Sequence, residues 1–246
     1  VPYFEDCARR AAVLLARDPA TVLVLGCEIS LFCAGFVPGA HLLDRIQGAM
    51  NPASWAGFTP AADFTTVQRD VVAMARKHFG GSISYASGEW EDIDWSLFDF
   101  VGVDLYRSAA NAATFDQLVS GYLKHGKPVV ITEFGCCTYQ GAQDAGGMGW
   151  AIVDYAAEPR CLTGEYVRDE SVQVSYFTEL LDVFEPAGVH GAFWFTFAGY
   201  ESPYDPDPRL DLDMASYGVV KIHKGGPWEP KQLWHAMARR YDRAAQ

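Results

Sequence analysis

Short runs rich in apolar residues alternate with longer amphipathic stretches along most of the chain. The apolar runs are typical of parallel strands that are covered on both faces, and they occupy residues 21–25, 83–86, 100–105, 129–132 and 191–196. Apolar positions at helical spacing predict helices over residues 4–17, 60–79, 111–124, 171–185 and 230–240. This alternation predicts a parallel sheet with crossover helices, either an open doubly wound sheet or a closed barrel.

The size and charge of the chain limit what it can bind. With 246 residues, half of them hydrophobic, the chain can bury one large core, so we predict a single domain over residues 1–246. A net charge of −12 argues against nucleic acid and against an anionic membrane, but it is compatible with a neutral saccharide. No run of eighteen apolar residues occurs, so no membrane span is predicted. Nucleotide-binding glycine motifs are likewise missing after the predicted strands.

The six cysteines follow no regular spacing, which favours free thiols over disulfides and hence a reducing, cytoplasmic location. The histidines have no metal-ligand spacing, and no cofactor or metal is expected. An acidic stretch, Asp205 to Asp213, offers oxygen ligands for Ca²⁺ but is better explained as a solvated loop broken by prolines.

Two glutamates follow predicted strands that lie far apart in sequence. Glu28 follows the first strand and Glu133 follows the fourth, and in α/β proteins the active site forms at the carboxyl ends of the strands. Glycoside cleavage needs one carboxyl group that protonates the leaving oxygen and one carboxylate that attacks the anomeric carbon. The pair therefore favours a glycosidase over two isolated, helix-capping glutamates.

Residues 20–200 resemble the endo-β-mannanase-like members of the clan A glycoside hydrolases, which are (β/α)8 TIM barrels. The resemblance rests on five strand ends, read as strands four to eight of that barrel: Leu25-Gly26-Cys27-Glu28, Ile83-Ser84-Tyr85, Val103-Asp104-Leu105-Tyr106, Thr132-Glu133-Phe134-Gly135 and Phe193-Trp194-Phe195. It implies a retaining mechanism with Glu28 as acid/base and Glu133 as nucleophile. It also implies that Tyr106 hydrogen-bonds the nucleophile.

The same resemblance implies a saccharide substrate whose ring stacks on Trp194. Further substrate-binding candidates are Cys27, Tyr85, Asp104, Arg107, Trp150 and Tyr200. Trp150 lies in a long insertion, residues 138–170, in which Tyr139 and Tyr166 are further candidates for sugar contacts. Cys27 stands where clan A enzymes usually have an asparagine that binds the sugar 2-hydroxyl, and a thiol is a poor donor for that contact.

Two other interpretations stay open. A catalytically silent barrel that binds carbohydrate or a protein partner is favoured by Cys27 and by the count of five strands instead of eight. A cysteine hydrolase would use Cys136 or Cys137 with His125, His190 or His223 as its base. The strand count also predicts that the first three βα units lie upstream or are lost, and that an exposed barrel edge would pair with another chain.

Overall fold

The computed structural model describes residues 2–244 and divides into two compact units. The first unit comprises the chain up to Leu105 together with Tyr122–Thr132. The second comprises Tyr106–Gly121 and the chain from Glu133 onward. Each unit is described below by itself, and the prediction of a single domain stays a prediction.

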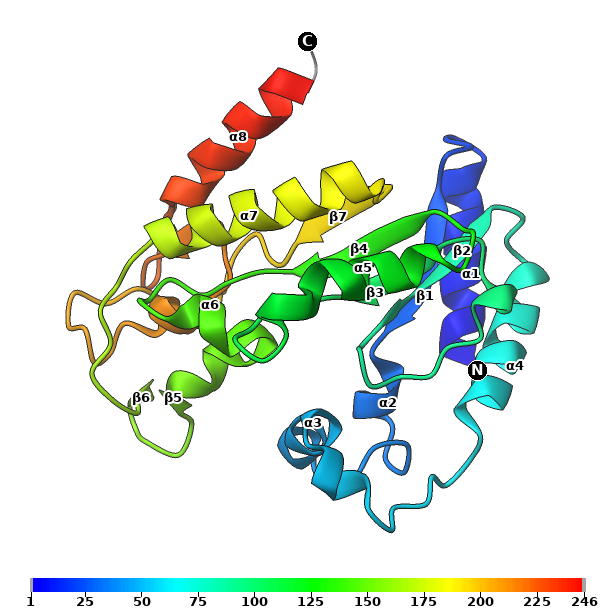
Figure 1. The fold of residues 1–246 in the computed structure, drawn as a ribbon, viewed down its shortest axis with the longest axis horizontal. Coiled ribbons are helices and arrows are strands. Elements are labelled where there is room, and N and C mark those ends of the chain that lie inside the picture. Colours follow the sequence, from blue (N-terminus) through cyan, green and yellow to red (C-terminus); the bar gives the residue numbers. More distant parts are fainter. Residues whose placement is uncertain (1, 245–246) are drawn as a thin grey trace. The chain divides into compact units, whose positions relative to one another are not determined.

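The first unit contains three strands, the start of a fourth, and the helices that connect them (Figure 1). Its elements are α1 (Pro2–Leu15), β1 (Val22–Cys27), α2 (Ile29–Phe32), α3 (Leu42–Met50), η1 (Pro52–Trp55), α4 (Phe64–Arg76), β2 (Ser82–Ser87), η2 (Trp95–Leu97), β3 (Val101–Asp104) and the first part of β4 (Val129–Phe134). Helices α1 and α4 pack side by side. Strands β1, β2 and β3 pair in parallel, with Leu23 opposite Ile83 and Ala86 opposite Gly102.

The second unit contains several short elements and two long helices, α7 and α8, which are separated in sequence by three short strands and a 3-10 helix. Its elements are η3 (Ala112–Thr114), most of α5 (Phe115–Leu123), α6 (Ala142–Ala145), η4 (Gly146–Ile152), β5 (Val153–Asp154), β6 (Cys161–Leu162), α7 (Ser171–Ala187), β7 (Gly191–Trp194), η5 (Leu212–Ala215), β8 (Val220–Ile222), β9 (Trp228–Pro230) and α8 (Gln232–Ala244). Strands β5–β6 and β8–β9 are two small antiparallel pairs. Helices α7 and α8 pack against each other.

The five predicted strands form one sheet in the order β1-β2-β3-β4-β7. Four of the five strands carry apolar side chains that are completely excluded from solvent or nearly so: Leu25, Ile83, Val101, Val103, Val129 and Ile131. Gly102 must be a glycine because a Cβ there would lie 2.2 Å from the Tyr85 carbonyl oxygen. The prediction of an α/β fold with a parallel sheet is therefore confirmed.

Two helix boundaries differ from the prediction. The helix expected to begin at Thr59-Pro60 begins instead at Phe64, because the Asp63 carboxylate accepts hydrogen bonds from the Thr65 and Thr66 amides and caps it. Pro186 does not end α7, which runs one residue further before Gly188 closes it in a left-handed conformation. The residues between β1 and α4 were not assigned, and they form α2, α3 and η1.

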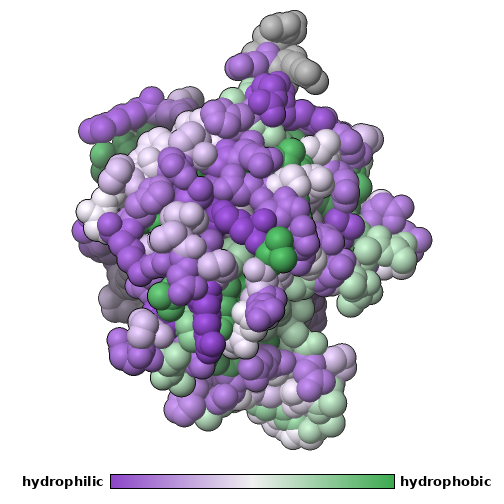
Figure 2. All heavy atoms as spheres, turned by 90° about the vertical axis from the view of Figure 1, so that its left-hand side faces the viewer, coloured by the Kyte–Doolittle hydropathy of each residue, from purple (hydrophilic) through white to green (hydrophobic). Residues whose placement is uncertain are grey.

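Hydrophilic side chains cover most of the surface that can be seen in one view of the molecule (Figure 2). The face drawn in Figure 2 is mostly hydrophilic, with only scattered hydrophobic residues. No helix within residues 2–244 is both long and apolar enough to cross a membrane.

Candidate active site

Glu28 occupies a strained backbone position directly after β1. Its φ of 45° and ψ of 41° lie in the left-handed region, and it is the single non-glycine residue with positive φ among residues 2–244. The Glu28 amide donates to the Ala86 carbonyl at 2.9 Å, which ties this corner to β2. A side chain in this conformation costs about 1–2 kcal/mol, and such strain concentrates at functional sites.

Cys27 and Asp104 lie together at the ends of β1 and β3. The Cys27 thiol donates to Asp104 Oδ2 at 3.2 Å, and the Thr132 hydroxyl donates to Asp104 Oδ1 at 2.6 Å. Asp104 is buried, whereas Cys27 is exposed. Both oxygens of Asp104 are thus occupied within the first unit, which favours a role in holding the strand ends over direct contact with a substrate.

Tyr106 and Glu133 meet in the second unit. The Tyr106 hydroxyl donates to Glu133 Oε2 at 3.0 Å, and both side chains are partly accessible to solvent. A hydrogen bond to a carboxylate stabilises its ionised form and fixes its direction. The Tyr106 ring is held in turn by an edge contact with Tyr217, at 5.9 Å between ring centroids.

Trp194 is fixed at the end of β7. Its indole N–H donates to the Tyr217 carbonyl at 2.8 Å, and its ring packs edge-on against Phe134 at 5.3 Å. The side chain stays partly exposed. A rigid indole with one accessible part is suited to stacking on a sugar ring.

Comparison with known proteins identifies the fold. No family model matches the chain, and no curated protein matches it. Among solved structures, a GH113 β-1,4-mannanase complex has a TM-score of 0.52 at 15% identity, over 88% of this chain and 57% of its own. A second GH113 β-1,4-mannanase structure has a TM-score of 0.51 at the same identity and coverage. A β-glucuronidase from an uncultured Clostridium sp. has a TM-score of 0.50 at 16% identity, over 98% of this chain and 36% of its own.

The chain has a fold similar to the TIM barrels of these enzymes. It spans little more than half the length of the mannanases that it resembles. The predicted TIM-barrel class is confirmed, with five βα strands of that barrel present in the described residues.

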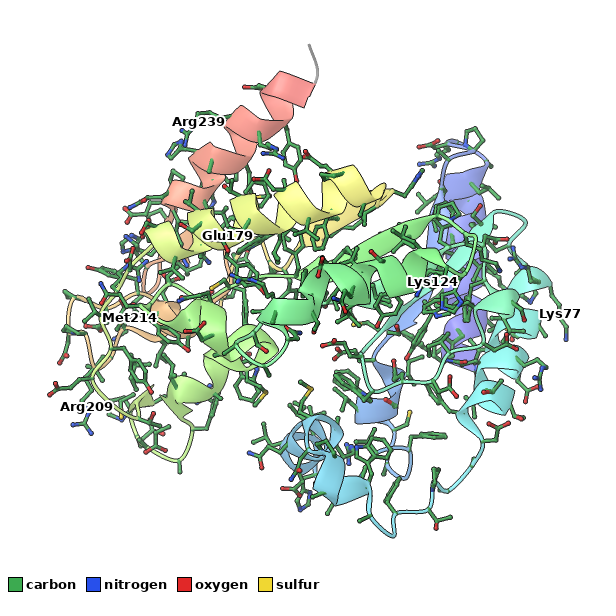
Figure 3. The ribbon with its side chains drawn as sticks, in the orientation of Figure 1. Lys77, Lys124, Glu179, Arg209, Met214 and Arg239 are labelled. Carbon is green, nitrogen blue, oxygen red and sulfur yellow. The ribbon has the colours of Figure 1, made fainter. Side chains whose placement is uncertain are left out.

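The other residues that were expected to bind substrate range from side chains packed inside the protein to side chains exposed to solvent. Arg107 pairs with Glu179 of α7 at 2.8 Å and lies over the Tyr176 ring, which favours a packing role. Glu179 is labelled on α7 in Figure 3. Trp150 packs against Tyr155 and is half-buried. Tyr200 is 71% exposed and accessible to a ligand. Within the insertion, the Tyr139 hydroxyl donates to the Gly149 carbonyl at 3.0 Å, and Tyr166 packs against the Tyr139 ring.

The cysteines next to Glu133 are poorly suited to nucleophilic chemistry. Cys136 and Cys137 are both buried, and burial raises the pKa of the Cys136 thiol to about 12 and that of Cys137 well above its ordinary value. A thiol acts as a nucleophile through its thiolate, so these values argue against the cysteine hydrolase. All six cysteines lie within residues 2–244, and none forms a disulfide there.

The acidic stretch is not the solvated loop that was expected, because its later part is buried around cations. Asp213 is 0% exposed and lies 2.9 Å from Lys231 and 2.8 Å from Arg168, and Asp211 lies 3.0 Å from Arg168. Met214, labelled in Figure 3, marks this turn. Arginine and lysine already neutralise these carboxylates, so they are poor candidates for Ca²⁺ ligands.

The first unit contains a cavity that was not predicted from the sequence. The cavity has a volume of about 420 Å³, and four aromatic rings and three acidic side chains line much of it: Phe36, Trp55, Phe64, Trp90, Asp63, Glu91 and Asp92. The sequence Trp90-Glu91-Asp92, a tryptophan followed by two acidic residues, could have indicated this site. Trp55 gave no signal because it belongs to the segment between β1 and α4 that was not assigned.

Tyr85, which was expected to bind substrate, contacts Phe64 and Glu91, two residues that line this cavity. It is 1% exposed, its hydroxyl donates to Glu91 Oε1 at 2.9 Å, and it accepts the Ile29 amide at 2.8 Å. Burial raises the pKa of Glu91 above its ordinary value, although four donors, including Ser30 and Tyr85, lower it. The Tyr85 hydroxyl is therefore engaged inside the protein.

Proposed function

We propose that the chain is part of a retaining glycoside hydrolase that cleaves a β-linked saccharide. The observation that carries the proposal is the 3.0 Å hydrogen bond from the Tyr106 hydroxyl to the Glu133 carboxylate. It provides a carboxylate of fixed direction at a strand end of a glycoside hydrolase fold. The strained backbone of Glu28, at the end of another strand, supports the second carboxyl group of the mechanism.

The proposed reaction has two steps. In the first, a Glu133 oxygen attacks the anomeric carbon, the glycosidic C–O bond breaks, and the Glu28 carboxyl proton passes to the departing oxygen. In the second, the Glu28 carboxylate takes a proton from water while the water oxygen attacks the anomeric carbon and the ester to Glu133 breaks. The sugar leaves with its original configuration.

The roles of the neighbouring side chains follow from their contacts. Tyr106 directs Glu133, and Trp194 presents its ring to the sugar. The thiol of Cys27 is held by Asp104, so the hydroxyl next to the anomeric carbon must be recognised by another group or accepted without a strong donor.

Loss of the nucleophile is the direct test of this assignment. Glu133→Ala is expected to leave no measurable turnover on a panel of aryl β-glycosides that includes β-mannosides and β-glucuronides. Glu185→Gln, an exposed carboxylate on α7, is the matched control and should keep full activity. A mechanism-based glycosyl inhibitor should label the peptide that contains Glu133. A label on another carboxylate, or turnover by Glu133→Ala, would remove Glu133 from the mechanism.

A second candidate function is carbohydrate binding without cleavage. It is favoured by Cys27 and by the aromatic, acidic cavity of the first unit. Titration of β-1,4-linked manno-oligosaccharides into Glu133→Ala protein separates binding from turnover. Binding that is lost in Trp55→Ala but kept in Trp228→Ala, with no turnover by the unaltered protein, would establish the binding function instead.

Two further expectations stay predictions. A cytoplasmic location is supported by the lack of disulfides among the six cysteines. Self-association through an exposed barrel edge is the other expectation that stays a prediction.

A further inference from the structure

The two peptide groups that follow Glu28 are held by side chains from another part of the first unit. The Ile29 amide donates to the Tyr85 hydroxyl at 2.8 Å, and the Ser30 amide donates to Glu91 Oε1 at 3.1 Å. The acceptors are joined to each other, because the Tyr85 hydroxyl donates to the same Glu91 oxygen at 2.9 Å. These contacts form one connected arrangement, which we term the Tyr85–Glu91 clamp.

The clamp replaces the ordinary way of capping a helix. The first amides of a helix have no partner within it, and the residue before the helix usually supplies one from its own side chain. Glu28 is the capping residue of α2, yet its side chain makes no capping hydrogen bond. Tyr85 and Glu91 accept those amides instead, so the Glu28 carboxyl group is not used as the helix cap.

The clamp is anchored by ring packing and by a further hydrogen bond. Tyr85 is 1% exposed, and its ring packs between Phe64 and Phe98 at 6.3 and 6.1 Å. The second oxygen of Glu91 accepts the Gly88 amide at 3.1 Å, which fixes the carboxylate from the other side. Two residues anchored in this way can hold the left-handed backbone of Glu28, which would otherwise relax to a less strained conformation.

A third contact joins the clamp to the wall of the cavity. The Trp90 indole N–H donates to the Ser30 hydroxyl at 3.0 Å, and Ser30, Trp90 and Glu91 all line the cavity. The α2 turn is thus tied down through both its backbone and a side chain.

We propose that Tyr85 and Glu91 are positioning residues that hold the backbone of Glu28 in its left-handed conformation and so direct its carboxyl group for proton transfer. The proposal rests on the proposed function of Glu28 as acid/base. Neither residue needs to touch the substrate. A displacement of about 1 Å in a catalytic group can reduce the rate about 100-fold, so loosening this backbone should change kcat more than KM.

Amide hydrogen exchange tests the clamp without a measurement of enzyme activity. Tyr85→Phe keeps the ring and removes the acceptor of the Ile29 amide, so exchange at Ile29 and Ser30 should become at least about 10-fold faster. Tyr122→Phe removes a hydroxyl elsewhere in the same unit and should leave both amides as protected as before. Unchanged protection of Ile29 in Tyr85→Phe would overturn the clamp itself.

Kinetics then tests the positioning role. On the substrate that the unaltered protein cleaves best, Tyr85→Phe should lower kcat about 10- to 100-fold and change KM by less than about threefold. Glu91→Gln keeps one acceptor oxygen and should retain more activity than Glu91→Ala, which keeps none. An unchanged kcat in Tyr85→Phe, despite faster exchange at Ile29, would overturn the positioning role.

The two measurements separate the two claims. Faster exchange in Tyr85→Phe, together with an unaltered protein that turns over no glycoside, would leave the clamp standing and contradict the glycosidase proposal. An active protein in which Glu28→Gln also has full activity would contradict the role assigned to Glu28 and, with it, the purpose of the clamp.

Discussion

Glu91 in the first unit and Asp213 in the second are both carboxylates with restricted access to solvent, but their partners differ in charge. Glu91 accepts from the Tyr85 hydroxyl and from two backbone amides, all of them neutral donors. Asp213 lies between the ammonium of Lys231 and the guanidinium of Arg168. Burial raises the pKa of Glu91 although its neutral donors lower it, and those donors fix the direction of the carboxylate. The cations beside Asp213 bind that carboxylate in ion pairs instead.

The contrast suggests that the charge of its partners distinguishes a carboxylate that stabilises the fold from one that supports the candidate active site. The ion pair between Asp213 of η5 and Lys231, the residue before α8, is fully buried. We therefore expect this pair to stabilise the fold of the second unit. Glu91 stands at a cavity wall and fixes a strained turn beside a proposed catalytic group. We therefore expect loss of a cation to change stability, and loss of a neutral donor to change activity.

The largest effect is expected when a buried cation is removed. Lys231→Met removes one of the two cations that contact the buried Asp213 carboxylate, and because Arg168 remains we expect the lower end of the range for a broken buried pair, a loss of about 3 kcal/mol in the free energy of unfolding. Lys224→Met removes an exposed lysine from its ion pair with Asp205 and should leave stability nearly unchanged. Urea titration of both variants measures this. Equal midpoints for the two variants would show that the buried pair is no more important than the surface pair.

A smaller effect, on activity, is expected when the neutral donor to Glu133 is removed. Tyr106→Phe deletes the hydrogen bond to the proposed nucleophile, and such bonds to charged groups contribute about 1.5–3 kcal/mol. That corresponds to a loss of about 10- to 150-fold in kcat/KM. Tyr241→Phe, whose ring packs on Phe177 away from this contact, is the control and should keep full activity. If Tyr106→Phe instead lowered stability by several kcal/mol at unchanged kcat/KM, the distinction drawn above would be wrong.

The Cys27–Asp104 contact gives a further comparison of donors. Cys27→Asn places an amide, a stronger donor than a thiol, at the end of β1. If the 2-hydroxyl of the sugar is recognised from this position, the variant should lower KM about threefold or more on the best substrate. Cys33→Asn, an exposed thiol beyond α2, is the control. An equal KM in both variants would assign that recognition to another residue.

The strands could be predicted from the sequence because each is a short apolar run. Burial is nearly complete along β2 and β3, whereas β1 leaves Val22 and Val24 exposed and β7 leaves Phe193 exposed. Helix boundaries were less certain, since Thr59-Pro60 and the Asp63 cap are both plausible starts and only the hydrogen bonds to Thr65 and Thr66 decide between them. The Tyr106–Glu133 contact followed from the family resemblance.

Contacts between distant residues could not be predicted in the same way. Asp211 and Asp213 suggested a solvated loop because the sequence does not show that Arg168 and Lys231 fold against them. Tyr85 suggested a substrate contact because it lies in a strand that enters the site, but its side chain points into the core and reaches Ile29 and Glu91. In both cases the environment of the side chain depends on residues that are distant in the sequence, so it could not be predicted from the sequence.

The last comparison rests on the sign of an effect and not on its size: it is the pH dependence of stability at Glu91 and at Glu170. Burial raises the folded-state pKa of Glu91 above its ordinary value of 4.5, so the folded protein binds more protons there than the unfolded chain does. Its contribution to stability is therefore complete below pH 4.5 and is lost as the pH rises through the raised folded-state pKa.

Glu170 behaves in the opposite way: burial opposes its charge, but hydrogen bonds from Arg168 and the Gln232 amide lower its pKa below 4.5, so its contribution is lost as the pH falls below that value. Chemical denaturation of Glu91→Gln and Glu170→Gln between pH 3 and pH 8 should give difference curves of opposite slope. Each slope is limited to about 1.4 kcal/mol per pH unit because one proton is involved. Slopes of the same sign would mean that folding shifts the pKa of both carboxylates in the same direction, which would contradict the comparison.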